Sequence, residues 1–195
     1  MRKYVMTTLL LGALCAGCVL KIEAAVTQQD IARSVIRFHV IADSDKPQDQ
    51  KVKLKVRDRV IDYLAGVLAG ADSAEESRAR IAAHLDDVEN IALEALQKEQ
   101  EDKTVTAALV TTHFPEKVYG DCTFPEGSYE ALQVKIGKAK GRNWWCVLYP
   151  GLCFEYSIRG VVTEEGKEKL SGVLTEEDME TILHEGKVKV RFRWF

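Results

Sequence analysis

The sequence predicts an α+β fold in two layers, with about five mainly antiparallel strands, two long helices and one short C-terminal helix. Two patterns support this prediction. Residues 45–70 and 73–102 carry apolar side chains at helical spacing on one face. Strand-like stretches, which are rich in β-branched and aromatic residues or alternate in polarity, occupy residues 34–42, 104–112, 128–137, 143–148 and 187–195.

The N-terminal segment is typical of an exported protein. Two basic residues precede an uncharged stretch at residues 4–20, and small residues follow it. We predict a signal peptide over residues 1–25 and a single domain over residues 26–195, because no Pro-rich or Gly/Ser-rich linker interrupts that length. A short membrane anchor through residues 4–20 and a lipoprotein signal ending at Cys18 are the alternatives. All three place the domain outside the cytoplasm.

Capping residues bound the two long helices. Asp45 and Gln48 are spaced as a capping box at the start of the first helix, which ends before Gly70. Ser73 and Glu76 form a second capping box at the start of the other long helix. The apolar faces comprise Val52, Val56, Val60 and Leu64 in the first helix and Ile81, Leu85, Val88, Ala92, Ala95 and Leu96 in the second.

The first and last strands differ in pattern. Residues 34–42 are mostly apolar, which predicts a central strand. Residues 187–195 alternate strictly, which predicts a strand with one buried face at the C-terminus. Between them, Thr175 and Asp178 cap the short third helix, which ends at Gly186.

The charge balance gives no support to nucleic-acid binding, because the formal net charge is −3. A run of basic residues lies between positions 46 and 59, and on a helix it forms mostly a solvated face. In an exported protein the same face can also dock to an acidic membrane or partner, and that alternative predicts binding that is lost at high salt. The run comprises Lys46, Lys51, Lys53, Lys55, Arg57 and Arg59.

The sequence offers few groups for catalysis. The four histidines are scattered, and no His-x-x-x-His or Cys-x-x-Cys pair of metal-binding spacing follows the N-terminal segment. There is no Gly-x-Ser-x-Gly elbow and no glycine-rich phosphate loop. We therefore predict no catalytic residue, no metal site and no cofactor. The alternative enzyme class is a cysteine hydrolase with Cys146 as nucleophile and His39 as base.

Three polar residues, Asp43, Ser44 and Asp45, follow the first predicted strand. Helix capping and turn formation are sufficient to explain these residue types. Three adjacent residues also supply too few oxygen ligands for a calcium site.

The aromatic run at residues 141–154 is the most distinctive part of the chain, with two of the three tryptophans and two of the five cysteines. Aromatic side chains suit either a buried core or a recognition surface. Neighbours on a strand point to opposite faces. We therefore predict that one of Trp144 and Trp145 enters the core and that the other faces outward as an interface anchor.

Three cysteines follow the N-terminal segment: Cys122, Cys146 and Cys153. The sequence alone allows several pairings. Pro150-Gly151 lies between the last two cysteines, in a position to turn the chain. A two-residue hairpin there would place Cys146 opposite Glu155, so a bond between Cys146 and Cys153 requires a looser loop.

Five motifs occur in a characteristic order: IRFHVIADSD at residues 36–45, LKVRD at 54–58, FPEGSYEA at 124–131, NWWCVLYP at 143–150 and LCF at 152–154. Together they resemble the family of stage II sporulation protein R, over roughly residues 30–155. The chain departs from the family pattern at Asp43, where Asn is usual, and at Gly151, where Pro is usual. Cys122 does not belong to the pattern.

The resemblance implies a non-catalytic signalling protein of endospore-forming bacteria. Such proteins are made in the forespore and exported across its membrane into the space between the two cells. There they activate a membrane-embedded aspartic protease of the mother cell, which cleaves the precursor of the early mother-cell sigma factor. We expect the partner-binding residues at Asp43, Ser44, Asp45, Trp144 and Trp145.

The family pattern also bears on the cysteines, because it contains Cys146 and Cys153. Export places both in an oxidising compartment. We therefore predict a disulfide bond between Cys146 and Cys153, with Cys122 left unpaired.

Overall fold

The structure of the protein is a computed structural model that describes residues 28–153 and 162–183. The predicted signal peptide over residues 1–25 and the predicted strand over residues 187–195 lie outside the described residues. The strands are β1 (Ile36–Ile41), β2 (Val105–Phe114), β3 (Lys117–Tyr119), β4 (Cys122–Phe124), β5 (Gly127–Ile136) and β6 (Asn143–Tyr149). The helices are α2 (Pro47–Val67), α3 (Ala74–Ala83), α4 (Leu85–Lys98), α6 (Glu164–Ser171) and α7 (Glu176–Ile182), and residues 28–34 are also helical.

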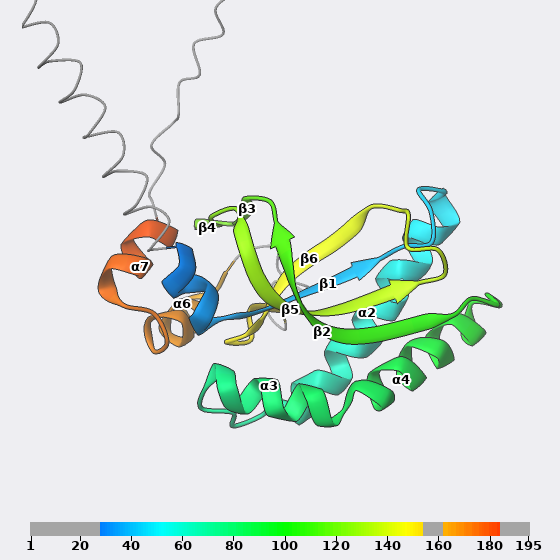
Figure 1. Ribbon diagram of the computed structural model, residues 1–195, viewed down its shortest axis with the longest axis horizontal. Coiled ribbons are helices and arrows are strands. Elements are labelled where there is room, and N and C mark those ends of the chain that lie inside the picture. Colours follow the sequence, from blue (N-terminus) through cyan, green and yellow to red (C-terminus); the bar gives the residue numbers. More distant parts are fainter. Residues whose placement is uncertain (1–27, 154–161, 184–195) are drawn as a thin grey trace, which may run out of the picture.

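A mixed four-stranded sheet lies at the centre of the fold (Figure 1). Its strand order is β2-β5-β1-β6, with β1 parallel to β5 and antiparallel to β6. Strands β2 and β5 form a long antiparallel pair, and β3 pairs with β4 in a separate small sheet. The predicted α+β class is therefore confirmed. The apolar sequence of β1 is explained by its central position, because both of its faces are buried.

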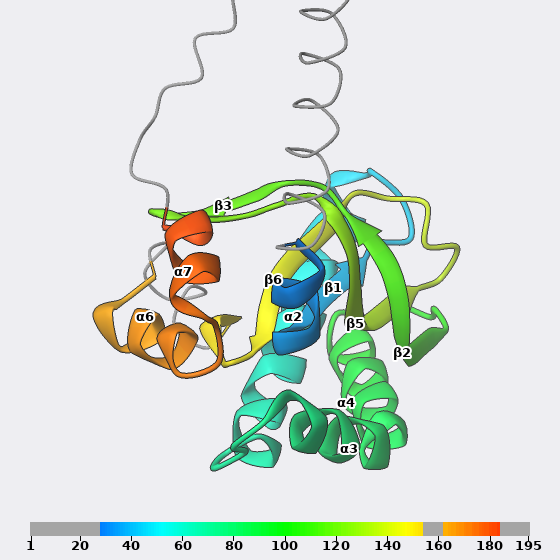
Figure 2. The ribbon, with the colours of Figure 1, turned by 60° about the vertical axis from the view of Figure 1, so that its left-hand side comes forward.

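Helices α2, α3 and α4 cover one face of the sheet (Figures 1 and 2). Val52, Val56 and Val60 of α2 are buried in one cluster with Phe38 and Val40 of β1. Burying a side chain of this size contributes about 1.5–3 kcal/mol, so this cluster is a main source of stability.

A second cluster covers the other face at one end of the sheet. Residues 28–34, the β3–β4 pair and helices α6 and α7 supply it, and Ile31, Phe124 and Ile182 are among its buried side chains. Figure 2 shows α6 and α7 beside this end of the sheet. The fold therefore has a partial third layer in addition to the two layers that the sequence predicted.

The predicted second helix is divided at His84, which ends α3 and begins α4. The imidazole Nδ1 of His84 lies 2.7 Å from the Tyr63 hydroxyl and 2.7 Å from a carboxylate oxygen of Asp87. Because Tyr63 belongs to α2, the break is tied to the neighbouring helix, and tertiary contacts override a helical pattern that runs through it.

The start of α2 also differs from the prediction. Lys46 occupies the N-cap position and makes no capping bond with its side chain. Asp45 is not available as the cap, because its carboxylate accepts a hydrogen bond from the backbone N–H of Arg142 at 2.7 Å. A long-range contact thus replaces the local capping box.

The caps predicted at Ser73 and Thr175 are confirmed. Their hydroxyls accept hydrogen bonds from the backbone N–H groups of Glu76 at 3.1 Å and Asp178 at 3.2 Å. Helix α6 and the β3–β4 pair are short elements that the sequence patterns did not predict. None of the helices within residues 28–153 and 162–183 is long and apolar enough to cross a membrane.

Candidate interaction site on the edge strand

Strand β6, which carries both tryptophans of the aromatic run, is an edge strand of the main sheet. Among the described strands it pairs with β1 alone. The register sets Trp144 opposite Val40 and Trp145 opposite His39. The two indoles therefore lie on opposite faces of the sheet, as predicted.

Trp144 lies on the face that the helices cover. Its ring meets the ring of Phe38 edge-on, with 5.8 Å between centroids, and the guanidinium of Arg57 lies 4.8 Å from the indole centroid. Arg57 in turn forms an ion pair with Asp58 at 2.6 Å. The Trp144 indole is only partly buried, at the margin of the cluster beneath α2, α3 and α4. The cation–π contact with Arg57 helps to hold it there.

Trp145 lies on the other face and packs against the second cluster. Its ring stacks on the imidazole of His39 at 4.9 Å and meets Phe114 edge-on at 4.6 Å. The ammonium of Lys117 lies 5.8 Å from the indole centroid. The prediction of one core and one outward tryptophan is therefore wrong: both are half-buried, because an edge strand leaves the rim of each face open.

His39 is a structural rather than a reactive group. It is only 2 % exposed, and the side-chain amide of Gln133 donates to its Nε2 at 2.9 Å. Burial, with smaller effects from Lys135 and Arg37, lowers the pKa of His39 to about 4, so the ring is neutral near pH 7.

The cysteine hydrolase alternative requires His39 beside Cys146, and the structure does not bring them together. Cys146 is paired in register with Phe38 and shares the helix-covered cluster with it, whereas His39 points to the opposite face. A nucleophile and its base must lie within hydrogen-bonding reach, or be linked by one water. Two side chains on opposite faces of a packed sheet do not meet this condition.

The three described cysteines are buried free thiols. Residues 152–153 are helical, and Cys153 lies in the same buried cluster as Cys146. Burial, followed by the Cys146 contact, raises the pKa of Cys153 well above its usual range. Burial also raises the pKa of Cys122 to about 11. The disulfide bond between Cys146 and Cys153 stays a prediction.

A buried arginine lies behind the edge strand and is a feature that the sequence analysis missed. Arg37 has no exposed surface; its Nε donates to the carbonyl oxygen of Cys146 at 3.2 Å and its Nη2 donates to the Tyr119 hydroxyl at 3.1 Å. No ion pair joins it to a carboxylate of the described residues. The only sequence signal was one charge within an apolar strand. Four rings surround the guanidinium, at 4.4 to 5.9 Å from their centroids: Phe114, Tyr129, Phe124 and Tyr119.

The loop of Asp43, Ser44 and Asp45 is held by internal hydrogen bonds. The carboxylate of Asp43 accepts from the backbone N–H of Lys138 at 2.6 Å, and the Ser44 hydroxyl donates to the carboxylate of Asp49. Lys103 also binds Asp49, and these two contacts hold the pKa of Asp49 below its usual value. The bonds of Asp43 to Lys138 and of Asp45 to Arg142, with two backbone bonds, fasten residues 42–46 to residues 137–142, directly before β6.

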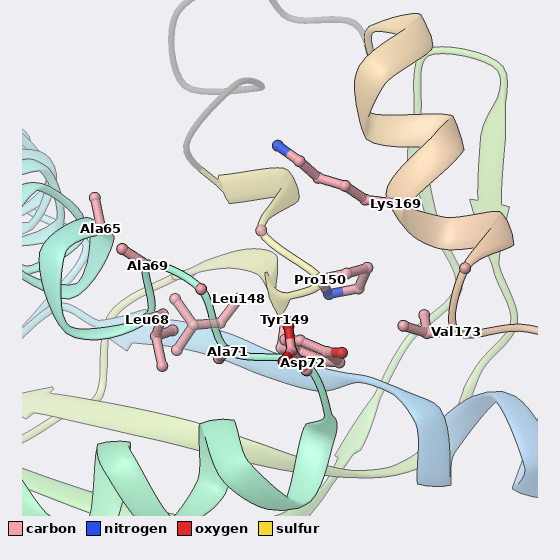
Figure 3. A pocket seen from close by; sticks show the side chains of 13 residues that line it. Ala65, Leu68, Ala69, Ala71, Asp72, Leu148, Tyr149, Pro150, Lys169 and Val173 are labelled. Carbon is pink, nitrogen blue, oxygen red and sulfur yellow. The ribbon is translucent and has the colours of Figure 1, made fainter.

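A pocket of about 420 Å³ lies at the far end of β6 (Figure 3). It lies between the α2–α3 connection, the end of β6 and α6. Leu68, Leu148 and Val173 give it apolar walls. Asp72, Tyr149 and Lys169 add polar groups, as Figure 3 shows. Within the described parts of the chain, no group of three or more His, Cys, Asp or Glu side chains could hold a metal ion.

Comparison with known proteins identifies the family of this chain. The family described as stage II sporulation protein R matches residues 32–160. The chain is 32% identical over 190 residues to stage II sporulation protein R of Bacillus subtilis (strain 168), an alignment that covers 93% of this chain and 85% of the relative. The chain belongs to the stage II sporulation protein R family. No solved structure matches it.

Family membership places the protein in sporulation and confirms the resemblance drawn from the sequence motifs. The matched segment runs from residue 32 to residue 160 and includes β1, with Arg37 and His39, as well as all of β6. The candidate site is the edge strand β6 together with Arg37 and His39 of β1, and all of it lies within the matched segment.

We predict that Arg37→Lys lowers the free energy of unfolding by about 3 kcal/mol, because lysine keeps a buried charge but loses the planar donors that reach Cys146 and Tyr119. Urea denaturation measures this loss. Arg57→Lys is the matched control: it replaces a cation that also lies over an aromatic ring but at the rim of its cluster, and we expect a loss of about 1 kcal/mol or less. Equal losses for the two variants would contradict the assignment of Arg37 as a buried structural cation.

We also predict that stability depends on the titration of His39. Its pKa is lowered from 6.5 to about 4, so the unfolded chain binds a proton that the folded chain does not bind in this pH range. The free energy of unfolding should therefore fall by up to about 3 kcal/mol as the pH drops from about 6.5 to about 4. Denaturation across this range should show a shallower slope for His39→Gln than for the exposed-site control His113→Gln. Identical slopes would show that His39 does not carry the effect.

Proposed function

We propose that this protein is a non-catalytic sporulation signal that activates a membrane-embedded aspartic protease of the mother cell. The activated protease then cleaves the precursor of the early mother-cell sigma factor. Family membership supports the role in sporulation. The non-catalytic part depends on one observation: His39 and Cys146, the nucleophile–base pair that the sequence offered, face opposite sides of the sheet.

Export is the second part of the proposal. The basic start, the uncharged residues 4–20 and the small residues after them support secretion across the forespore membrane into the space between the two cells. If residues 1–25 are retained instead of cleaved, the same segment associates the protein with the membrane. In both cases the domain faces the compartment in which an extracytoplasmic surface of the protease is accessible.

The surface that we propose for the protease is the outer edge of β6 with the rims of its two tryptophans. An edge strand presents unpaired backbone groups that an extended segment of a partner can pair with. Tryptophan is the residue type most enriched among interface anchors. Next to Trp145, Lys117 extends from β3, and the neighbouring Val118 is 59 % exposed, which is unusual for a valine in a strand.

Asp43, Ser44 and Asp45 have a different part in this proposal. The carboxylates of Asp43 and Asp45 fasten the loop that leads into β6, and the Ser44 hydroxyl bonds Asp49 of α2. We propose that they act by positioning the strand and not by contacting the protease. This interpretation agrees with the ordinary role of such residues in turns.

The decisive experiment is reconstitution of the pathway in a non-sporulating bacterium that produces the protease and the sigma-factor precursor. We expect precursor cleavage when the full chain is exported, and none when residues 1–25 are deleted, because the folded domain then stays on the wrong side of the membrane. Immunoblotting measures cleavage, and a heterologous signal peptide fused to residue 26 should restore it. Cleavage by the truncated cytoplasmic chain would contradict the proposal.

A single exposed residue tests the proposed surface. Val118→Glu should reduce precursor cleavage about tenfold or more, because it introduces a charge at an exposed apolar residue of β3, the strand that carries Lys117 beside Trp145. Its free energy of unfolding should change by no more than about 0.5 kcal/mol. Thr111→Glu, at an exposed position of the opposite edge strand β2, is the control and should cleave like the unchanged chain. If Val118→Glu is stable and fully active, the protease contacts another surface.

A further inference from the structure

Two loops and the start of α2 bring lysines together at one end of the molecule. Hydrogen bonds from Lys140 and Gly141 to the carbonyl oxygens of Asp43 and Ala42 join the loop at residues 137–142 to the loop that precedes α2. In Figure 1 the two loops lie together at the right-hand end. We call this region the lysine surface and define it as Lys46, Lys51, Lys55, Lys138 and Lys140.

The charges of the lysine surface are free to face a partner. All five ammonium groups belong to exposed residues, and none of the five forms an ion pair with another residue of the described ranges. Nearby acids are engaged by other groups. Asp45 binds Arg142, while Asp49 and Glu101 share Lys103.

An acidic helix lies at the opposite end of the molecule. Helix α7 has three acidic residues in its first turn and no basic residue in its last turn. Figure 1 shows α6 and α7 at the left-hand end, far from the lysine surface.

We infer that the lysine surface docks to a membrane that contains anionic lipids. Its cations are lysines, which act as mobile point charges and suit a diffuse layer of headgroups better than a single phosphate or carboxylate. They are spread over loops and a helix, and the pocket described above lies at the other end of β6. Leu54, between Lys51 and Lys55 on α2, is 38 % exposed and can enter the headgroup layer.

The position of the N-terminus leaves this surface accessible. The helical segment at residues 28–34, dark blue in Figure 1, lies toward the left-hand end, away from the lysine surface. A chain held in one membrane by residues 4–20 can therefore present its lysines to a second membrane. This docking is independent of whether the protein activates a protease.

The experiment uses the full chain inserted through residues 4–20 into phosphatidylcholine vesicles. These first vesicles are loaded with sucrose so that they sediment. Fluorescent vesicles without sucrose are then added, made either of phosphatidylcholine or of phosphatidylcholine with phosphatidylglycerol, and co-sedimentation measures their capture. Because the N-terminal segment already occupies the first vesicle, capture in trans reports on the folded domain. We expect capture of the anionic vesicles alone, at about 0.1 M salt but not at about 1 M salt.

Two triple variants locate the effect. Lys51→Gln with Lys138→Gln and Lys140→Gln should weaken capture on the order of 100-fold, at about 1 kcal/mol for each lysine. The control, Arg33→Gln with Lys117→Gln and Lys169→Gln, removes the same charge from residues away from the lysine surface and should weaken it less than about threefold. Thermal unfolding verifies that both variants fold.

Three results would overturn the inference. They are equal capture of neutral and anionic vesicles, equal losses for the two triple variants, and no capture of anionic vesicles by the unchanged chain. If the chain instead binds immobilised polyglutamate but no anionic vesicle, the lysine surface serves an acidic protein and not a lipid membrane.

Discussion

The second cluster of the fold depends on the buried guanidinium of Arg37. A cation removed from water costs several kcal/mol unless it is hydrogen-bonded or surrounded by favourable charge. In the described structure the compensation comes from two hydrogen bonds, to Cys146 and Tyr119, and from four aromatic faces. Since Tyr119 belongs to β3 and Cys146 to β6, one side chain of the central strand ties the small sheet and the edge strand to the same point. The helices that cover this face pack around that arrangement.

The edge strand is positioned from its other end by polar contacts. Asp43 and Asp45 accept backbone hydrogen bonds from residues 137–142, and β6 begins at the next residue, Asn143. Gly137 has a φ of +55°, and a Cβ there would lie 2.3 Å from an Asp43 oxygen, so the close approach requires glycine. The acidic residues that looked like a binding site in the sequence therefore determine where the tryptophans lie.

Local sequence patterns predicted the helices and strands better than the way in which these elements pair and pack. The apolar run at residues 34–42 and the valine stripe of α2 identified β1 and α2, because burial on one strand or one helix face leaves a period in the sequence. The parallel pairing of β1 with β5 left no such trace, since it joins residues about 94 apart. The same limit applies to Trp144 and Trp145: alternation placed them on opposite faces, but only the edge position of β6 explains why both are half-buried. Arg37 was missed because a single charge in an apolar strand does not reveal the rings around it.

The packing of β6 limits what a partner can contact. One face is occupied by Phe38 and Arg57 around Trp144, and the other by His39 and Phe114 around Trp145. The accessible parts are the two indole rims and the outer edge of β6, which pairs with β1 alone among the described strands; together they form a narrow strip. The thiols of Cys146 and Cys153 lie behind this strip. A bond between them would close a short loop and stabilise the fold by about 2–3 kcal/mol without altering either rim. Under the proposed export, oxidation of this pair would make the strip more rigid, and a rigid strip loses less entropy when the proposed partner binds it.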